Sequence, residues 1–201
     1  MAIRTLFVDL GGVVVHANVG KTCERLAGLC GKTPSEVESL IYGKLNQDFD
    51  EGLLTEREFF LKALLELGTV DIGEHEFWDY WNDIFGINEE VVDALRATRA
   101  NGVEVIAASN LDPVRFESVK ATGALEVFDR LGISFQMRTR KPFKTFYRRI
   151  LGLTSSAPSE CLFVDDRMEN TDAAIDFGLQ SILYISPDAL RRVLRGYGVL
   201  P

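Results

Sequence analysis

The sequence predicts an α/β fold: a doubly wound, mostly parallel sheet with a helical segment inserted after its first strand. Short runs of β-branched and other apolar residues alternate with stretches of helical periodicity, which is typical of a parallel sheet covered on both faces. Several of these runs end in polar residues. The long stretch 14–87 has helical periodicity, contains both tryptophans and shows no convincing strand. These three observations together favour a sheet with one long helical insertion.

Five apolar runs are expected to form the sheet, because each has the length and composition of a buried strand. The expected strands are 5–9, 103–109, 131–135, 161–166 and 181–185, of which 131–135 has the weakest pattern. Helices are expected at 89–100, 144–151 and 169–177. The first of these helices begins with acidic residues and ends with Arg96 and Arg99, which suits the helix dipole, and Gly102 follows it.

Two parts of the chain are therefore expected. Residues 1–14 and 89–201 would form the α/β core, and residues 15–88 would form a helical cap. A structureless loop of that length would be uncommon. The aromatic side chains around Trp78 and Trp81 are expected to form the core of the insertion.

Composition excludes several classes of protein. With 201 residues, 46% of them hydrophobic and 26% charged, intrinsic disorder is excluded. The formal net charge of −8 disfavours nucleic acids and anionic membranes as partners, and no apolar run is long enough to span a bilayer. Three cysteines, Cys23, Cys30 and Cys161, lack the spacing of a metal site and are expected to be reduced thiols. A cytoplasmic protein is expected, as a monomer or homodimer.

Polar residues stand where the expected strands end. Asp9 ends the first strand, Ser109 the second, and Asp165 and Asp166 the fourth, while Lys141 with the following proline is expected to begin the helix before the fourth strand. Ligands bind beyond the carboxyl ends of strands in open parallel sheets. Each residue alone could serve as a cap or a turn, but four such signals in order indicate a site.

The chemistry of these residue types is specific. Asp9 is a candidate nucleophile, since a carboxylate can form a covalent intermediate. Together with Asp165 and Asp166 it offers the hard oxygen ligands that Mg²⁺ prefers. Ser109 and Lys141 can bind phosphate oxygens and neutralise charge that develops during transfer. The adjacent glycines at positions 11 and 12 allow the backbone to approach an anion closely.

Five segments of the chain follow one another in the same order as the motifs of a known family. They are Asp9-Leu10-Gly11-Gly12-Val13, the run 50–59 of the insertion, Ser109-Asn110, Lys141-Pro142, and Asp165-Asp166 with Asn170, Ala174 and Gly178. This ordered set resembles the haloacid dehalogenase-like hydrolase superfamily over nearly the whole chain. Within that superfamily it is most similar to capped phosphatases, including glucose-1-phosphate phosphatase-like enzymes and the N-terminal domain of soluble epoxide hydrolases. The resemblance implies a Rossmann-like core.

The resemblance also implies roles for single residues. Asp9 would be the nucleophile and a Mg²⁺ ligand, the main-chain carbonyl of Gly11 a second ligand, and Asp166, with or without Asp165, would complete the metal site. Ser109 and Lys141 would hold the transferring phosphoryl group, with Lys141 also pairing with Asp9. Gly12 and Asn110 would contribute to substrate binding, Asn110 by orienting the site through its backbone amide or side chain. Asn170 would support the site from behind.

One position departs from the family's commonest pattern. That pattern has a second aspartate where this chain has Gly11, and the aspartate protonates the leaving group and then activates water. General acid–base help of this kind contributes about 10² to 10⁴ in rate. His16, seven residues after Asp9, could replace the missing group or could be a hinge residue with a local hydrogen bond.

The absence of an aspartate at position 11 leaves three alternative functions. The favoured prediction is a Mg²⁺-dependent phosphatase that hydrolyses a small phosphorylated metabolite through an aspartyl-phosphate on Asp9. A haloacid dehalogenase would tolerate the missing acid, because halide leaves without a proton, but it needs no metal. The adjacent pair Asp165 and Asp166 would repel each other without a cation or proton, which favours the metal-dependent enzyme. A catalytically impaired binding protein is the third alternative.

Overall fold

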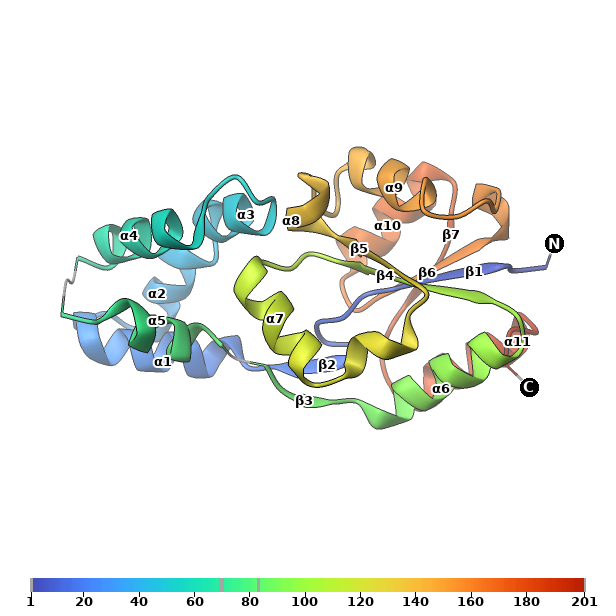
Figure 1. The fold of residues 1–201 in the computed structure, drawn as a ribbon, viewed down its shortest axis with the longest axis horizontal. Coiled ribbons are helices and arrows are strands. Elements are labelled where there is room, and N and C mark those ends of the chain that lie inside the picture. The colour runs from blue at the N-terminus through green and yellow to red at the C-terminus, as the bar shows by residue number, and fades with distance from the viewer. Residues whose placement is uncertain (1, 69–70, 83, 201) are drawn as a thin grey trace.

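A five-stranded parallel sheet forms the centre of the protein. The computed structural model describes residues 2–68, 71–82 and 84–200. The sheet has the order β5-β4-β1-β6-β7, and every neighbouring pair is parallel (Figure 1), which confirms the predicted α/β class. Its strands are β1 (Thr5–Val8), β4 (Glu104–Ser109), β5 (Arg130–Ile133), β6 (Cys161–Asp165) and β7 (Gln180–Leu183).

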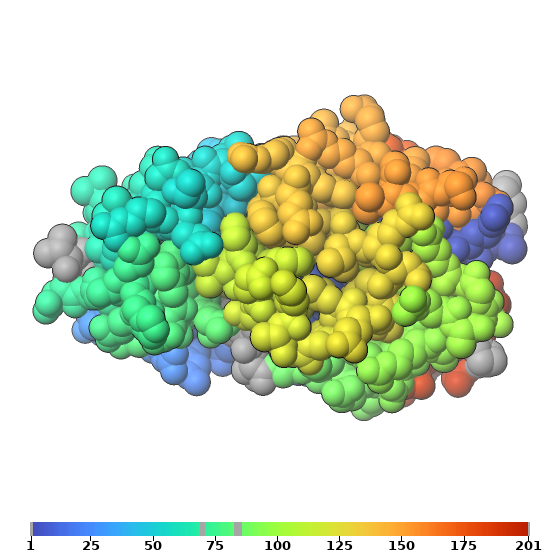
Figure 2. Space-filling view, viewed as in Figure 1, coloured from blue at the N-terminus to red at the C-terminus, as the bar shows by residue number. Residues whose placement is uncertain are grey.

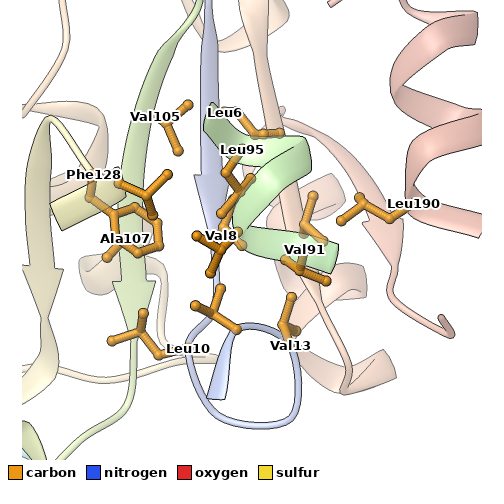
Figure 3. Packing of buried hydrophobic residues seen from close by; sticks show 14 of the residues in the cluster. Leu6, Val8, Leu10, Val13, Val91, Leu95, Val105, Ala107, Phe128 and Leu190 are labelled. Carbon is orange, nitrogen blue, oxygen red and sulfur yellow. The ribbon is translucent and has the colours of Figure 1, made fainter. Parts of the chain in front are cut away.

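Helices cover both faces of this sheet because the side chains of each strand alternate between the faces. On β1, Leu6 and Val8 belong to the cluster that includes side chains of α6 (Glu89–Ala100) and α11 (Pro187–Gly196). Figure 3 shows this packing, with Leu95 of α6 beside Val8. Phe7 lies on the opposite face, against α9 (Lys144–Leu151) and α10 (Met168–Phe177). The central strand is therefore buried from both sides, as its continuous apolar sequence predicts.

A helical unit follows β1 in the chain and lies at the end of the molecule opposite to both termini (Figure 1). Its helices are α1 (Val19–Cys30), α2 (Pro34–Ile41), α3 (Lys44–Asp50), α4 (Glu56–Leu67) and α5 (Glu74–Trp81). Its centre is aromatic: the ring centroids of Phe59 and Trp81 are 4.7 Å apart, and both side chains are fully buried. The expectation that the aromatic residues form a core within the insertion is confirmed.

A second, two-stranded sheet connects the helical unit to the core. β2 (Val15–Ala17) and β3 (Ile84–Ile87) pair antiparallel, with Val15 opposite Ile87 and His16 opposite Gly86. The expectation that 14–87 contains no strand is therefore wrong. These strands have three and four residues, and each is stabilised by a partner far away in the sequence, so local periodicity does not reveal them.

The remaining expected elements lie within a few residues of their predicted bounds, with two corrections. The third strand ends at Ile133 rather than 135, because Ser134 begins the short helix α8 (Ser134–Met137) and bonds through Oγ to the backbone of Leu111. Lys141 lies ahead of α9 rather than at its start, since that helix begins at Lys144. The structure also has α7 (Pro113–Ala121) and two short 3-10 turns, Ala124–Val127 and Pro158–Glu160.

Two expectations about the whole chain can be compared with the structure. All three cysteines are free thiols, as expected. Across the part of the chain that the structure describes, no helix has the combination of length and apolarity that crossing a membrane requires.

Candidate active site

The polar strand ends meet at one edge of the parallel sheet. Asp9 follows β1, Ser109 ends β4 and Asp165 ends β6, and β1 pairs directly with both β4 and β6. Because neighbouring parallel strands end at the same edge, the three side chains are brought together. All three are buried.

Lys141 joins two of these groups. Its Nζ lies 2.9 Å from Asp9 Oδ1 and 2.6 Å from Asp165 Oδ2, and the side chain is 1% exposed. Burial alone would lower the pKa of Lys141, but the carboxylates of Asp9 and Asp165 outweigh it and hold that pKa above its ordinary value. The lysine is therefore a fixed positive charge between two carboxylates.

Asp9 lies in an environment that disfavours its charge. Burial, and then the neighbouring Asp165, raise the pKa of Asp9 to about 7, against the opposing effects of Lys141 and of a hydrogen bond from Ser109. Its Oδ1 also accepts a hydrogen bond from the backbone N–H of Leu10, at 2.8 Å. A single ammonium does not fully compensate the carboxylates gathered here.

Asp165 is held by hydrogen bonds on both oxygens. Oδ2 accepts from Lys141, while Oδ1 accepts from Asn170 Nδ2 and from the backbone N–H of Arg167, each at 2.9 Å. Asn170 is itself buried, and its backbone carbonyl accepts a 2.7 Å bond from the hydroxyl of Tyr147. Asn170 thus lies behind the site and orients Asp165.

Asp166 lies against the loop after β1. A Cβ atom on Gly12 would be 2.1 Å from Asp166 Oδ2 and would displace that carboxylate, and the φ of +74° at Gly12 favours glycine. Oxygen atoms of Asp9, Asp165 and Asp166 lie within 4.8 Å of one another. Burial and then Asp165 raise the pKa of Asp166. Three carboxylates beside one ammonium form a donor set that suits a divalent cation with hard oxygen ligands.

Asn110 fixes the backbone of Lys141. Its Oδ1 accepts from the Lys141 N–H at 2.8 Å, and its Nδ2 donates to the Lys141 carbonyl at 3.0 Å. Asn110 therefore orients the site through its side chain.

A pocket of about 560 Å³ lies between this edge of the sheet and the helical unit. Gly11 lines it from the core, and nothing lies within 4 Å of the position that a Cβ atom of Gly11 would occupy. The structure therefore leaves room for a side chain at position 11. His16 does not line this pocket among the described residues; it is exposed on β2.

The helical unit contributes polar residues to the pocket for which the sequence predicted no role at the site. Among them are Asn46, Gln47 and Asp50 of α3. Burial, and then the neighbouring Asp112, raise the pKa of Asp50 to about 8, while Arg115 and Arg140 act in the opposite direction. Asp50 Oδ2 accepts a 2.8 Å bond from Asn46 Nδ2. Asp50 lies in the run 50–59 noted for its resemblance, but its place in the same pocket as Gly11 depends on how the helical unit packs.

The curated proteins that match the sequence include the following two. The chain is 31% identical to drimenol cyclase drtB of Aspergillus calidoustus over 198 residues, 96% of this chain and 36% of that protein. It is 33% identical to flavin mononucleotide hydrolase 1 of Arabidopsis thaliana over 60 residues, 30% of this chain and 24% of that protein. The chain therefore matches only about a quarter to a third of the length of these relatives.

Solved structures share the fold. A HAD family enzyme of Bacteroides thetaiotaomicron, BT-2542, has a TM-score of 0.87 at 19% identity, covering 97% of this chain and all of that one. The wild-type form of that enzyme in complex with magnesium and inorganic phosphate has a TM-score of 0.79 at 21% identity, covering 90% and 93% of the two chains. L-2-haloacid dehalogenase of Xanthobacter autotrophicus is less similar, with a TM-score of 0.65 at 18% identity, covering 99% and 85%.

The family model described as haloacid dehalogenase-like hydrolase matches residues 3–178, which include every polar residue gathered at the edge of the sheet. That match extends from before β1 to the end of α10 and so includes the inserted helices. The sequence order of the site residues, the parallel sheet and the family model agree. The chain belongs to the haloacid dehalogenase-like hydrolases.

Proposed function

We propose that this hydrolase is a Mg²⁺-dependent phosphatase that cleaves a small phosphomonoester through an aspartyl-phosphate on Asp9. The observation that carries the proposal is the cluster of Asp9, Asp165 and Asp166 around the single ammonium of Lys141. Nucleophile, cation ligands and phosphate-binding charge are the parts that phosphoryl transfer needs. The structural similarity to an enzyme solved with magnesium and inorganic phosphate supports the same class of reaction.

The residues present fit a magnesium ion. Asp9, Asp166 and the carbonyl of Gly11 would hold it, and the bound ion would neutralise charge on the phosphoryl oxygens. Asp165 belongs to the same cluster, but Lys141, Asn170 and the Arg167 amide already occupy its two oxygens. We therefore assign Asp165 mainly to holding Lys141, and Asp166 to the metal.

The chain's own residues account for the two steps of hydrolysis. Asp9 attacks phosphorus, and the bond from phosphorus to the leaving oxygen breaks, with its electron pair staying on that oxygen. Lys141 and Ser109 hold the phosphoryl oxygens during this step. Water then attacks the phosphorus of the aspartyl-phosphate, which releases inorganic phosphate and restores Asp9. Because position 11 carries no carboxyl group, the leaving oxygen takes its proton from water, and esters with acidic leaving groups are cleaved fastest.

The helical unit would act as the cap that selects the substrate. It supplies one wall of the pocket through α3, while Gly11, Asn110 and Arg140 line the pocket from the core. A pocket of this size holds a small molecule rather than a macromolecule. The proposed partner is therefore a small phosphorylated metabolite.

The test is hydrolysis of p-nitrophenyl phosphate with and without Mg²⁺. Its leaving group needs little protonation, so the assay tests the nucleophile and the metal without the absent acid. We expect turnover that is lost on chelation and in Asp9→Asn but kept in Asp172→Asn, which changes an exposed carboxylate on α10. Turnover that survives in Asp9→Asn would exclude the proposed nucleophile. If the wild type is inactive with Mg²⁺, halide release from 2-haloacids tests the dehalogenase alternative.

A further inference from the structure

Arg140 connects the helical unit to the backbone of Lys141. Its Nη2 donates to Gln47 Oε1 at 2.8 Å and its Nε donates to Glu51 Oε1 at 3.1 Å, so two bonds reach the end of α3. Its Nη1 donates to the carbonyl oxygen of Lys141 at 3.0 Å. One planar guanidinium thus binds both the insertion and the loop that carries the lysine.

The acceptors on the insertion are arranged for this contact. Gln47 and Glu51 are four residues apart, so they lie on the same face at the end of α3. The side chains of Arg140 and Glu51 are only 17% and 18% exposed. Dissolved ions therefore screen this ion pair less than they screen a pair on the surface. The guanidinium also lies over the ring of Phe143, 4.8 Å from its centroid. These contacts restrict Arg140 to one geometry.

Among the described contacts, two side chains make hydrogen bonds to the backbone of Lys141. Its carbonyl accepts from Arg140 and Asn110, and its N–H donates to Asn110. Asn110 directly follows β4 of the core and has no hydrogen bond to the insertion among the described contacts. Arg140 is the part of this network that also requires α3.

Arg138, a neighbour of Arg140, also binds the insertion, so it allows the attachment of the insertion to be tested separately from the placement of Lys141. Arg138 donates to the carbonyl of Gly52, at the turn after α3. That turn lies so close to α8 that a Cβ on Gly52 would be 2.6 Å from the carbonyl oxygen of Phe135. Figures 1 and 2 show α3 beside α8 along this edge. Arg138 therefore binds the same turn, without a hydrogen bond to Lys141 among the described contacts.

We propose that Arg140 is a positioning residue, which couples the docking of α3 on the core to the placement of Lys141 between Asp9 and Asp165. This inference rests on the proposed function for its effect on turnover. Lys141 would reach its full order only when the insertion is docked, so the residues that choose the substrate and those that bind the phosphoryl group would come into place together.

The first test compares Arg140→Ala with Arg138→Ala in hydrolysis of p-nitrophenyl phosphate. We expect Arg140→Ala to lower kcat by about 10- to 100-fold with a smaller change in KM, because small displacements of a catalytic group have effects of that size. Arg140→Lys should recover only part of this loss, since an ammonium cannot reach three acceptors in the fixed directions of a guanidinium. Arg138→Ala should keep the wild-type kcat. An unchanged kcat in Arg140→Ala, or an equal loss in Arg138→Ala, would overturn the coupling.

A second variant acts from the insertion side. Glu51 does not line the pocket within the described chain, so Glu51→Ala removes an Arg140 contact without removing a pocket side chain. We expect Glu51→Ala to lower kcat, and the double variant with Arg140→Ala to be no worse than Arg140→Ala alone. Fully additive losses would contradict a shared role.

Hydrogen–deuterium exchange tests the coupling without turnover and so separates it from the proposed function. Peptides covering 139–147 should exchange faster in Arg140→Ala and Glu51→Ala than in the wild type, but not in Arg138→Ala. If the wild type cleaves no phosphomonoester, this pattern still supports the coupling, and unchanged exchange in both variants would refute it.

Discussion

Gly12 and Asp166 are so close that no side chain fits between them: a Cβ on Gly12 would lie 2.1 Å from Asp166 Oδ2. The positive φ of Gly12, +74°, adds a second reason for glycine. The loop after β1 therefore sets the position of the carboxylate that we assign to the metal. In a sequence, Gly12 and Asp166 are two separate signals; in the structure they form one contact.

Replacement of Gly12 should disturb the metal site. In Gly12→Ala, the Asp166 carboxylate must move, and we expect Mg²⁺ to activate the enzyme about 10- to 100-fold more weakly, as for other losses of groups that orient a metal ligand. The measurement is a Mg²⁺ titration of turnover. Gly28→Ala, in helix α1 where nothing lies within 4 Å, is the matched control. An unchanged Mg²⁺ requirement in Gly12→Ala would contradict this account.

The two adjacent aspartates should differ in their response to Mg²⁺. Metal that binds only the folded state raises the unfolding temperature of the wild type. Asp166→Asn should lose most of this increase while its unfolding temperature without metal changes little, because Asp166 is exposed. Asp165→Asn should lower the unfolding temperature even without metal, since it removes a buried partner of Lys141. Thermal unfolding with and without Mg²⁺ measures both; equal responses would refute the division of roles.

Position 11 should accept the acid that the chain lacks. Apart from its chain neighbours, no atom lies within 4 Å of a Cβ at Gly11, and its φ is not in the left-handed region, so the backbone accepts a side chain there. We expect kcat/KM for an alkyl phosphate such as glycerol 2-phosphate to rise by up to about 100-fold, because its leaving oxygen needs a proton. The rate with p-nitrophenyl phosphate should change much less. An equal gain on both substrates would argue against leaving-group protonation, and no gain on either would indicate another base or steric exclusion.

Asp50 should make the protein less stable as pH rises. Its pKa is about 8 in the folded protein, against about 3.9 when unfolded. Between these values the folded state retains a proton that the unfolded state has released, so the free energy of unfolding falls from about pH 4 to about pH 8. Asp50→Asn removes this contribution.

The measurement for Asp50 is thermal unfolding at pH 5, 6.5 and 8 without metal. Asp50→Asn should gain stability relative to the wild type as pH increases, with the largest difference at pH 8. Asp172→Asn, at an exposed site, should run parallel to the wild type. Parallel curves for Asp50→Asn and the wild type would show that Asp50 titrates near its ordinary pKa.

Local sequence signals account for the five strands of the parallel sheet and for helices α6, α9 and α10, whereas α7 and α11 were not predicted. Helix α9 has the predicted bounds 144–151, and helix α6 the predicted 89–100, because periodicity and end signals are properties of consecutive residues. The paired strands β2 and β3 were not predicted, since each is very short and gains its hydrogen bonds from the other. The same holds for α8, whose start depends on the contact between Ser134 and Leu111.

Some features of the candidate site were also predictable from the sequence, and others were not. Asp9, Ser109 and Asp165 could be selected because strands that run parallel bring their carboxyl ends to one edge. The pairing of Lys141 with Asp9 was implied by the resemblance, and the structure gives it a distance of 2.9 Å. No signal in the sequence places Asp50 in the same pocket as Gly11, because that arrangement depends on how the helices of the insertion pack.

The sequence by itself determined the fold class, the family and the edge of the sheet where the polar residues gather, because alternation, strand-end residues and motif order are encoded locally along the chain. Only the tertiary structure decided which oxygens of Asp165 are already bonded, that Gly12 touches Asp166, and that Arg140 connects α3 to Lys141. The bonds from Lys141 to Asp165 and from Arg140 to Glu51, and the contact of Gly12 with Asp166, join residues far apart in sequence. Their distances depend on the packing of the helical unit and the strands, which no local pattern specifies.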